Sequence, residues 1–239
     1  MPATWKALYD TQVVGVYALL VLPVSFLGRL AARGFATGPG VEPYAARFVR
    51  AWTIVFALAS IADPIATGLF GVSLVPFVLL GDFRVFALVL PVMQPGRSRA
   101  SVLLEALGWT LVVPAIAFGS VRLVTLVHGG EPPGALLWIA YESAFAMLTV
   151  FLMARVVPLR VGVERAPVRR YLRSVLGVVL AYYVLWVTAD VVVLLGHDGG
   201  WGLRVVANLL YYGAFVPLAY ARFFAARSVV SSSSTQAAR

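Results

Sequence analysis

Seven long apolar segments dominate this sequence and constrain its fold more than any other feature. A hydrocarbon layer of about 30 Å is crossed by roughly 20 apolar helical residues. Segments of that length occupy residues 12–31, 49–70, 74–94, 101–127, 134–158, 171–195 and 203–225. Of the 239 residues, 61% are hydrophobic and 12% are charged, whereas soluble chains carry about 25% charged residues. The sequence therefore predicts an all-α, polytopic membrane protein with seven transmembrane helices.

Residue types that support most enzyme chemistry are scarce. The chain has no cysteine and two histidines, which excludes disulfides and thiolate metal sites and leaves little for a zinc or iron site. No nucleotide-binding glycine loop or Ser-His-Asp arrangement is present. We therefore expect no cofactor and no bound metal, and any transport to be facilitative or ion-coupled. The first ten residues lack the features of a cleaved secretory signal, so the first apolar segment is expected to remain as a spanning helix.

Positive charges are divided unevenly between the two sets of loops, and Lys and Arg near span ends are retained in the cytoplasm. One side carries Arg29, Arg33, Arg47, Arg50, Arg97, Arg99, Arg155, Arg160, Arg165, Arg169, Arg170, Arg173, Arg222, Arg227 and Arg239, against Lys6, Arg122 and Arg204 on the other. The N-terminus is therefore predicted outside and the C-terminus in the cytoplasm, in a multi-pass protein of a bacterial-type inner cell membrane. The net charge of +9 then reports topology, and no nucleic-acid partner is expected.

The first three and last three spans resemble one another at an offset of about 126 residues. The corresponding pairs are Asp82 with Asn208, Pro91 with Pro217, and Asp63 with Asp190. This pattern predicts two parallel three-helix repeats, at residues 1–100 and 129–227, joined by a linker helix at 101–128. The tail at 228–239 is predicted to be disordered.

Polar side chains within the spans are the main functional signal, because a charge at bilayer depth is costly and usually faces the bundle interior. The candidate residues for substrate or proton binding are Asp63, Asp82, Arg84, Glu142, Asp190, Asn208, Trp186 and Tyr212. No catalytic residue is assigned. Glu105 lies near a predicted cytoplasmic span end and is expected to be wet at the interface rather than buried.

Counting residues from the turns places these polar groups at two similar depths. Asp63 and Asp82 flank the turn between the second and third spans, and Asp190 and Asn208 flank the loop at residue 198 in the same way. The two levels are predicted to form one central site, with Asp63 and Asp82 paired or both near Arg84. Carboxylates without His or Cys suit protons or hard cations. The structural alternative is that Arg84 simply neutralises Asp82, while Asp63 and Asp190 cap backbone groups at kinks.

The predicted architecture resembles that of the SWEET and PQ-loop transporter families. It has three spans, a linking span and three more spans, with Asp82 and Asn208 at matching depths. The resemblance covers nearly the whole chain and is one of architecture, since the Pro-Gln dipeptide is absent and the first span offers Pro23-Val24. It implies a facilitative transporter. Asp82 and Asn208 would stand where paired asparagines contact substrate in SWEET-type sugar transporters.

The helix count and orientation are also similar to those of microbial rhodopsins. The segment at 172–183 carries part of the likeness, and Asn208 and Tyr212 stand at the spacing of that family's Asp and retinal-binding Lys. Lys6 is the only lysine and lies outside the spans, so a covalent retinal Schiff base cannot form there. This resemblance implies an opsin-like sensor or scaffold without its chromophore.

A third resemblance is to presenilin-type intramembrane aspartyl proteases. The run LGDF at residues 80–83 looks like part of their Gly-x-Gly-Asp motif, with Asp63 as the second acid. Two carboxylates that share a proton can activate water. The motif is incomplete, because Leu79 stands in place of the first glycine and Asp63 is not preceded by Tyr.

The sequence as a whole predicts an integral membrane transporter of a small polar or cationic solute, facilitative or proton-coupled. The alternatives are the opsin-like sensor or scaffold and the aspartyl protease. The expected partners are the lipid bilayer and a small solute or proton. A second copy of the chain or another membrane protein stays open as a further partner.

Overall fold

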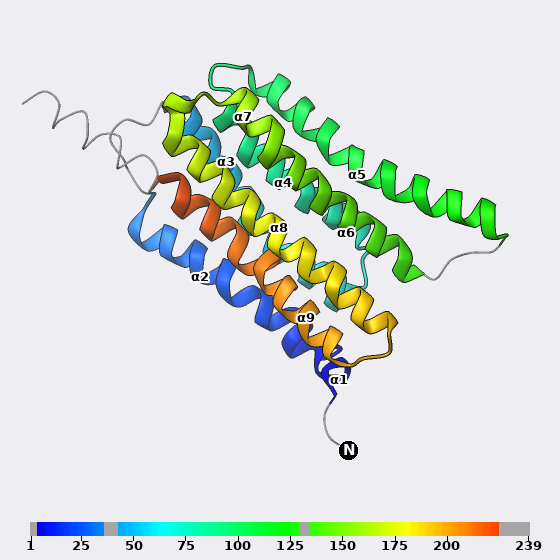
Figure 1. The fold of residues 1–239 in the computed structure, drawn as a ribbon. Helices are drawn as coiled ribbons and strands as arrows, with labels where there is room; N and C mark the ends of the chain where they lie inside the picture. The colour runs from blue at the N-terminus through cyan, green and yellow to red at the C-terminus, as the bar shows by residue number, and fades with distance from the viewer. Residues whose placement is uncertain (1–3, 36–42, 130–133, 225–239) are drawn as a thin grey trace, which may run out of the picture.

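The computed structural model describes residues 4–35, 43–129 and 134–224, which form helices without a strand (Figure 1). Seven helices are long and apolar enough to cross a membrane: Val13–Arg33, Phe48–Phe70, Val75–Met93, Arg99–Val127, Gly134–Arg160, Val163–Leu194 and Gly199–Phe224. The predicted all-α, multi-pass membrane protein with seven spans is confirmed at this level. The predicted tail at 228–239 lies outside the described residues.

The spans are built from the following segments, in chain order. A short α1 (Trp5–Tyr9) precedes a first span of η1 (Val13–Tyr17) and α2 (Ala18–Arg33), and α3 (Pro43–Phe70), α4 (Val75–Met93) and α5 (Arg99–His128) form the next three. The fifth span consists of α6 (Gly134–Phe151), η2 (Leu152–Val156) and α7 (Val157–Arg160), and the sixth of η3 (Val163–Arg165) and α8 (Ala166–Leu194). The last span comprises α9 (Gly199–Asn208), η4 (Leu209–Ala214) and a continuing helix to residue 224.

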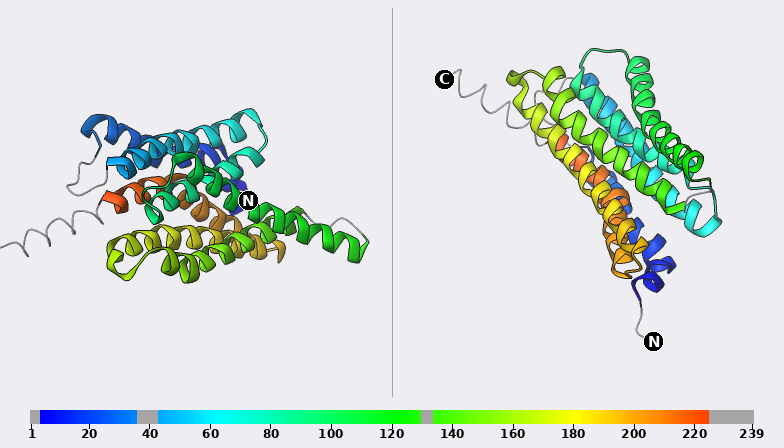
Figure 2. Two further views of the ribbon diagram at one scale, coloured as in Figure 1. Left: turned by 90° about the horizontal axis from the view of Figure 1, so that it is seen from above. Right: turned by 45° about the vertical axis from the view of Figure 1, so that its right-hand side comes forward.

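Consecutive spans pack side by side in a ring. Each span contacts the next one along the chain, and η4 of the last span packs against α2 of the first. α4 also contacts α8 across the ring and has the largest buried share among the seven spans. α5 packs against α4 and α6, and its C-terminal half diverges from the other helices (Figures 1 and 2). The division of this ring into two repeats, and the side on which each terminus lies, stay predictions.

Three spans contain a π-helical turn, which the sequence analysis did not predict. These turns are η1 in the first span, η2 in the fifth and η4 in the last. Such turns occur mostly as short interruptions of α-helices and are frequent at functional sites. Prolines inside the spans have a smaller effect, since Pro64 and Pro91 lie inside α3 and α4 without ending either helix.

The sixth helix begins before residue 171, where the apolar segment was predicted to start. α8 starts at Ala166 with Pro167 in its first turn, a position that suits proline because its missing N–H would have no intrahelical partner there. The Arg169 side chain donates to the carbonyl oxygens of Val161 at 2.7 Å and Pro158 at 3.1 Å. It thereby satisfies carbonyls at the end of the preceding helix, and the basic segment is ordered rather than a simple loop.

A close approach between α4 and the last span depends on Gly81. A Cβ atom at this position would lie 1.5 Å from the hydroxyl oxygen of Tyr211 and 2.5 Å from its Cζ atom. Tyr211 is itself buried, so no larger residue fits unless this ring moves. Gly108 on α5 is the opposite case, because nothing lies within 4 Å of the same position.

We expect Gly81→Ala to lower the melting temperature of the detergent-solubilised protein, and Gly108→Ala to raise it or leave it unchanged. Alanine in a helix interior is favoured over glycine by roughly 0.5–1 kcal/mol. For Gly108→Ala this gain in stability is not offset by any steric contact, because the position is open. At Gly81 the displacement of a packed ring costs about 1–3 kcal/mol. Equal melting temperatures for the two variants would contradict the close approach.

Candidate functional site

The residues that line a cavity of about 280 Å³ lie towards one end of the bundle. This end carries α1, the α3–α4 turn and the α8–α9 loop (Figure 1). Much of the cavity wall is aromatic, with rings from Tyr9, Trp138, Tyr141, Tyr183, Trp186, Tyr211 and Tyr212. Polar side chains on the wall are Thr67, Glu142, Arg204 and Asn208. An aromatic wall with few polar groups is the usual character of a small-molecule site.

The predicted site residues divide into two groups around this cavity. Glu142, Trp186, Asn208 and Tyr212 line the wall. Asp63, Asp82, Arg84 and Asp190 are buried behind it, each less than 5% exposed. The structure therefore brings the predicted residues into one region of the bundle, although only half of them face the cavity.

Asn208 connects two neighbouring elements at the wall. Its Oδ1 atom accepts a hydrogen bond from the indole nitrogen of Trp186 at 2.9 Å, and its Nδ2 atom donates to the hydroxyl of Tyr9 at 3.4 Å. The Trp186 ring also packs on Tyr211, with centroids 4.9 Å apart. Asn208 thus holds α8 and α1 against the last span.

Asp82 reaches the cavity only through two tyrosines. Its carboxylate is fully buried and accepts hydrogen bonds from the hydroxyl groups of Tyr141 on α6 and Tyr183 on α8. Both rings form part of the cavity wall. The matching depths of Asp82 and Asn208 therefore do not give two equivalent wall residues, because Asp82 lies one layer deeper.

Arg84 is a buried cation, 3% exposed, held mainly by neutral groups. Its Nη1 atom donates to Ser60 Oγ at 2.9 Å, and its Nη2 atom donates to the backbone carbonyl of Tyr211, within the π turn η4, at 2.6 Å. The guanidinium group lies 4.0 Å from the Tyr211 ring centroid and 5.0 Å from that of Phe215. In the described residues Arg84 forms no direct salt bridge with Asp82. The structure therefore does not show the simple Arg84–Asp82 ion pair of the structural alternative.

Asp63 lies with Ser60 and Arg84 on a second, small pocket next to the cavity residues Tyr211 and Tyr212. Its neighbour Thr67 donates to the Asp63 backbone carbonyl at 2.8 Å and approaches Oδ1 at 3.4 Å. Tyr212 is within hydrogen-bonding reach of the same carboxylate. The charge of Arg84 acts on both Asp63 and Asp82, which agrees with the prediction that both acids lie near it.

Asp190 is paired with a cation that the sequence analysis placed among the outer loop residues. Arg204 lies in α9 and donates from Nε to Asp190 Oδ1 at 2.6 Å. Asp190 is 1% exposed, and its Oδ2 atom has no hydrogen-bond partner among the described residues. The pair had a sequence signal, since residues 190 and 204 stand at similar distances on either side of the loop at 198.

Glu142 is the acid that faces the cavity. It is 8% exposed, and its Oε2 atom is buried without a hydrogen-bond partner in the part of the chain that the structure describes. Electrostatic interactions connect it to Asp190 and Arg204. Glu142 therefore belongs with that ion pair rather than with Asp82 and Asp63.

Two sets of charged groups thus surround the cavity. The Arg84 set is Asp63, Asp82 and Arg84, and the Arg204 set is Glu142, Asp190 and Arg204. When every group is ionised, each set carries one uncompensated negative charge. Because an uncompensated charge in a membrane interior is costly, each set is suited to take up a positive charge, as a proton or a bound cation.

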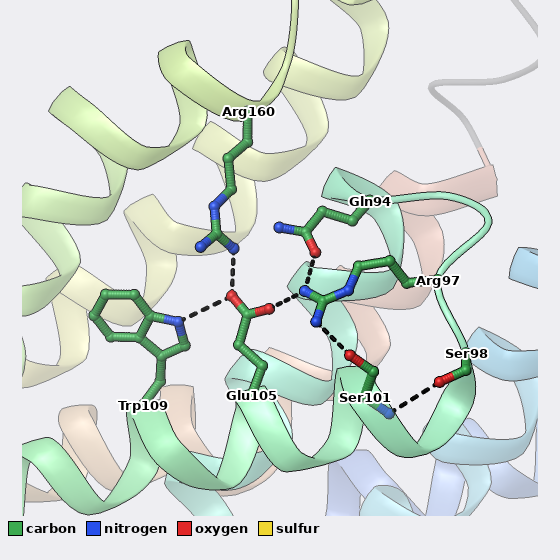
Figure 3. Close-up of polar contacts among 7 residues, drawn as sticks. All are labelled: Gln94, Arg97, Ser98, Ser101, Glu105, Trp109 and Arg160. Carbon is green, nitrogen blue, oxygen red and sulfur yellow. Dashed lines mark hydrogen bonds and ion pairs between the residues drawn. The ribbon is translucent and has the colours of Figure 1, made fainter.

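A polar network around Glu105 lies near the start of α5, towards the opposite end of the bundle (Figure 3). The Glu105 carboxylate accepts hydrogen bonds from Arg97, from Arg160 at the end of α7, and from the indole nitrogen of Trp109 at 3.3 Å. Its side chain is 17% exposed. Glu105 is therefore partly exposed near a span end, as expected, although two arginines cover part of its side chain.

No group of three or more His, Cys, Asp or Glu residues that could hold a metal ion occurs in the described residues. Comparison of the chain with known protein families, with curated proteins and with solved structures finds no match. The resemblances to transporter, opsin and protease families stay hypotheses on the residues that carry them.

We expect Arg84→Gln to reduce the free energy of unfolding by about 3–5 kcal/mol, the usual cost of removing one partner from a buried group of charges. Adding Asp82→Asn should recover part of this loss, because one unpaired negative charge disappears. Arg173→Gln, on an exposed position of α8, is the control and should change stability by less than about 0.5 kcal/mol. Unfolding in detergent micelles measures all three, and equal effects at Arg84 and Arg173 would refute the structural role of Arg84.

Proposed function

We propose that this protein is an integral membrane transporter of a small polar or cationic solute, with proton coupling through its buried carboxylates. The observation that carries the proposal is the cavity within the spans, with Glu142 on its wall and uncompensated acids behind it. Ionisable residues inside a membrane are retained chiefly where they serve a solute, ion or proton pathway. A cavity of about 280 Å³ suits a small solute.

The difference between the two ends of the bundle supports an alternating-access mechanism. The aromatic cavity lies towards one end, whereas at the other end the Glu105 network joins α5 to α7. Near the middle of α4, Phe86 packs against Trp109 and Phe145. This conformation corresponds to a state that faces the side of the N-terminus, predicted to be outside. Opening the other end would break the partly exposed ion pairs of Glu105 with Arg97 and Arg160 and hydrate these side chains. Such exposed pairs contribute little stability, so the cost of opening is small.

Proton coupling follows from the charges of the two sets. A cation that enters the cavity would compensate the excess negative charge of the Arg204 set. A proton bound to Glu142 or Asp190 would then no longer be needed for charge balance and could leave. The Arg84 set lies one layer deeper and is connected to the wall by Tyr141, Tyr183 and Tyr212. Exchange of a cation for a proton at these groups would couple solute movement to a proton gradient.

An opsin-like sensor is the second candidate. Each span packs on the next and the last returns to the first, which is compatible with that resemblance as well as with a transporter. Lys6 lies in α1 and pairs with the exposed Asp10, so it does not reach the cavity. A sensor would bind a ligand in the same cavity without moving it across the membrane.

The protease alternative is less compatible with the geometry. An aspartyl pair needs two carboxylates that share a proton and a water. Both oxygens of Asp82 accept hydrogen bonds from tyrosines, while Asp63 interacts with Thr67. Because tyrosines engage both oxygens of Asp82, we do not propose this activity.

Flux in proteoliposomes tests the transport proposal. Under an imposed pH gradient, we expect wild type to move a solute from a panel of organic cations, sugars and amino acids. Asp82→Asn and Asp190→Asn should each reduce this flux about tenfold or more, the effect of losing roughly 1.4 kcal/mol of charge interaction. Asp10→Asn removes an exposed acid and should leave the flux unchanged. Wild-type vesicles without flux across the whole panel would contradict transport and favour the sensor.

The orientation can be tested by labelling, because the chain has no cysteine. His197→Cys lies in the α8–α9 loop and Glu164→Cys in η3, both exposed and at opposite ends of the sixth span. A membrane-impermeant maleimide should label His197→Cys in intact cells and Glu164→Cys only after lysis. The reverse pattern would contradict the predicted topology.

A further inference from the structure

The cavity wall contains one charged group without a full set of partners. Glu142 on α6 is more than nine-tenths buried, faces the cavity and has an Oε2 atom without a hydrogen-bond partner in the described chain. The cation of the same set, Arg204, is already engaged with Asp190 at 2.6 Å. One oxygen of this wall residue is thus buried without a hydrogen bond, and Glu142 forms no direct salt bridge in the described residues.

Aromatic rings from two helices share the cavity wall with Glu142. Trp138 lies one turn before Glu142, on the same face of α6, and packs edge-on against Tyr141 with centroids 6.2 Å apart. Trp186 of α8 lies on the same wall and packs against Tyr211 at 4.9 Å. Ring faces attract a cation within about 6 Å of the centroid, and Trp does so most strongly.

We propose that this cavity binds a small organic ammonium cation, with its charge between Glu142 and the indole rings of Trp138 and Trp186. The carboxylate supplies the charge attraction, and the rings supply an apolar cation-binding surface that needs no hydrogen bonds from the ligand. This combination suits an alkylated ammonium group. The proposal names the substrate class of the proposed transporter and rests on that function for its role, whereas the binding itself is independent of transport.

Other classes of solute fit this wall less well. An anion would meet Glu142 and two net negative sets, because Arg204 is already paired. A sugar needs several free hydrogen-bonding groups, but Asn208 is engaged by Trp186 and Tyr9. A divalent metal ion needs several oxygen ligands, and no suitable cluster of acids occurs in the residues described.

Equilibrium binding of radiolabelled choline to the full chain in detergent tests this assignment. We expect saturable binding of choline and competition by tetramethylammonium. The uncharged carbon analogue of choline, dimethylbutanol, has the same shape and should compete at least about tenfold more weakly, because it lacks the charge that Glu142 and the rings recognise.

Variants place the binding at the named residues. Glu142→Gln should weaken choline binding about tenfold or more, since it keeps the shape but loses the charge, and Glu142→Asp should have an intermediate effect. Trp186→Leu should weaken binding roughly two- to thirtyfold through loss of a cation–π contact. Glu164→Gln, an exposed acid in η3, is the matched control and should bind as wild type does. Melting temperatures identify any variant that fails to fold.

If tetramethylammonium and the uncharged dimethylbutanol compete equally well with choline for the wild-type protein, the proposal is overturned. This test needs no variant. Wild-type affinity in a folded Glu142→Gln variant would also overturn it. Choline binding without flux would support the site while contradicting transport. Flux of a sugar or amino acid without choline binding would overturn the ammonium assignment and leave the transport proposal in place.

Discussion

The high cost of burying charge in a bilayer is the constraint on which the rest of this structure depends. Arg84 meets it without a direct ion pair in the described residues, through a hydroxyl of α3, a backbone carbonyl in the π turn η4, and two aromatic faces. The guanidinium group thereby joins three spans at one point. Gly81 allows the same close approach, because its lack of a side chain leaves room for Tyr211.

The same requirement shapes the cavity. The tyrosines that satisfy Asp82 are also wall residues, and the arginine that satisfies Asp190 lies on the wall as well. A ligand that displaces any of these side chains changes the environment of a buried carboxylate. Charge compensation therefore offers a direct physical connection between occupancy of the cavity and protonation of the acids behind it.

Much of this arrangement could be predicted from sequence, and the failures have physical reasons. The length of the apolar segments predicted all seven spans, because it depends only on local composition. The charged residues within those spans predicted which side chains lie on or behind the cavity wall. Tyr141 and the Asp190–Arg204 pair were not predicted, since their roles depend on contacts between helices. The π turns lie within apolar spans, and no sequence pattern distinguished them from α-helix. The early start of α8 depends on Arg169, whose side chain donates to carbonyl oxygens at the end of the preceding helix.

The most direct test of the central claim is the number of protons released when an ammonium cation binds. Calorimetric titration of the solubilised protein with tetramethylammonium, in buffers of different ionisation enthalpy, measures that number. We expect release of protons on binding, because the cation supplies the positive charge that the buried acids require. Binding with no dependence on the buffer would show that no proton is exchanged and would contradict the account.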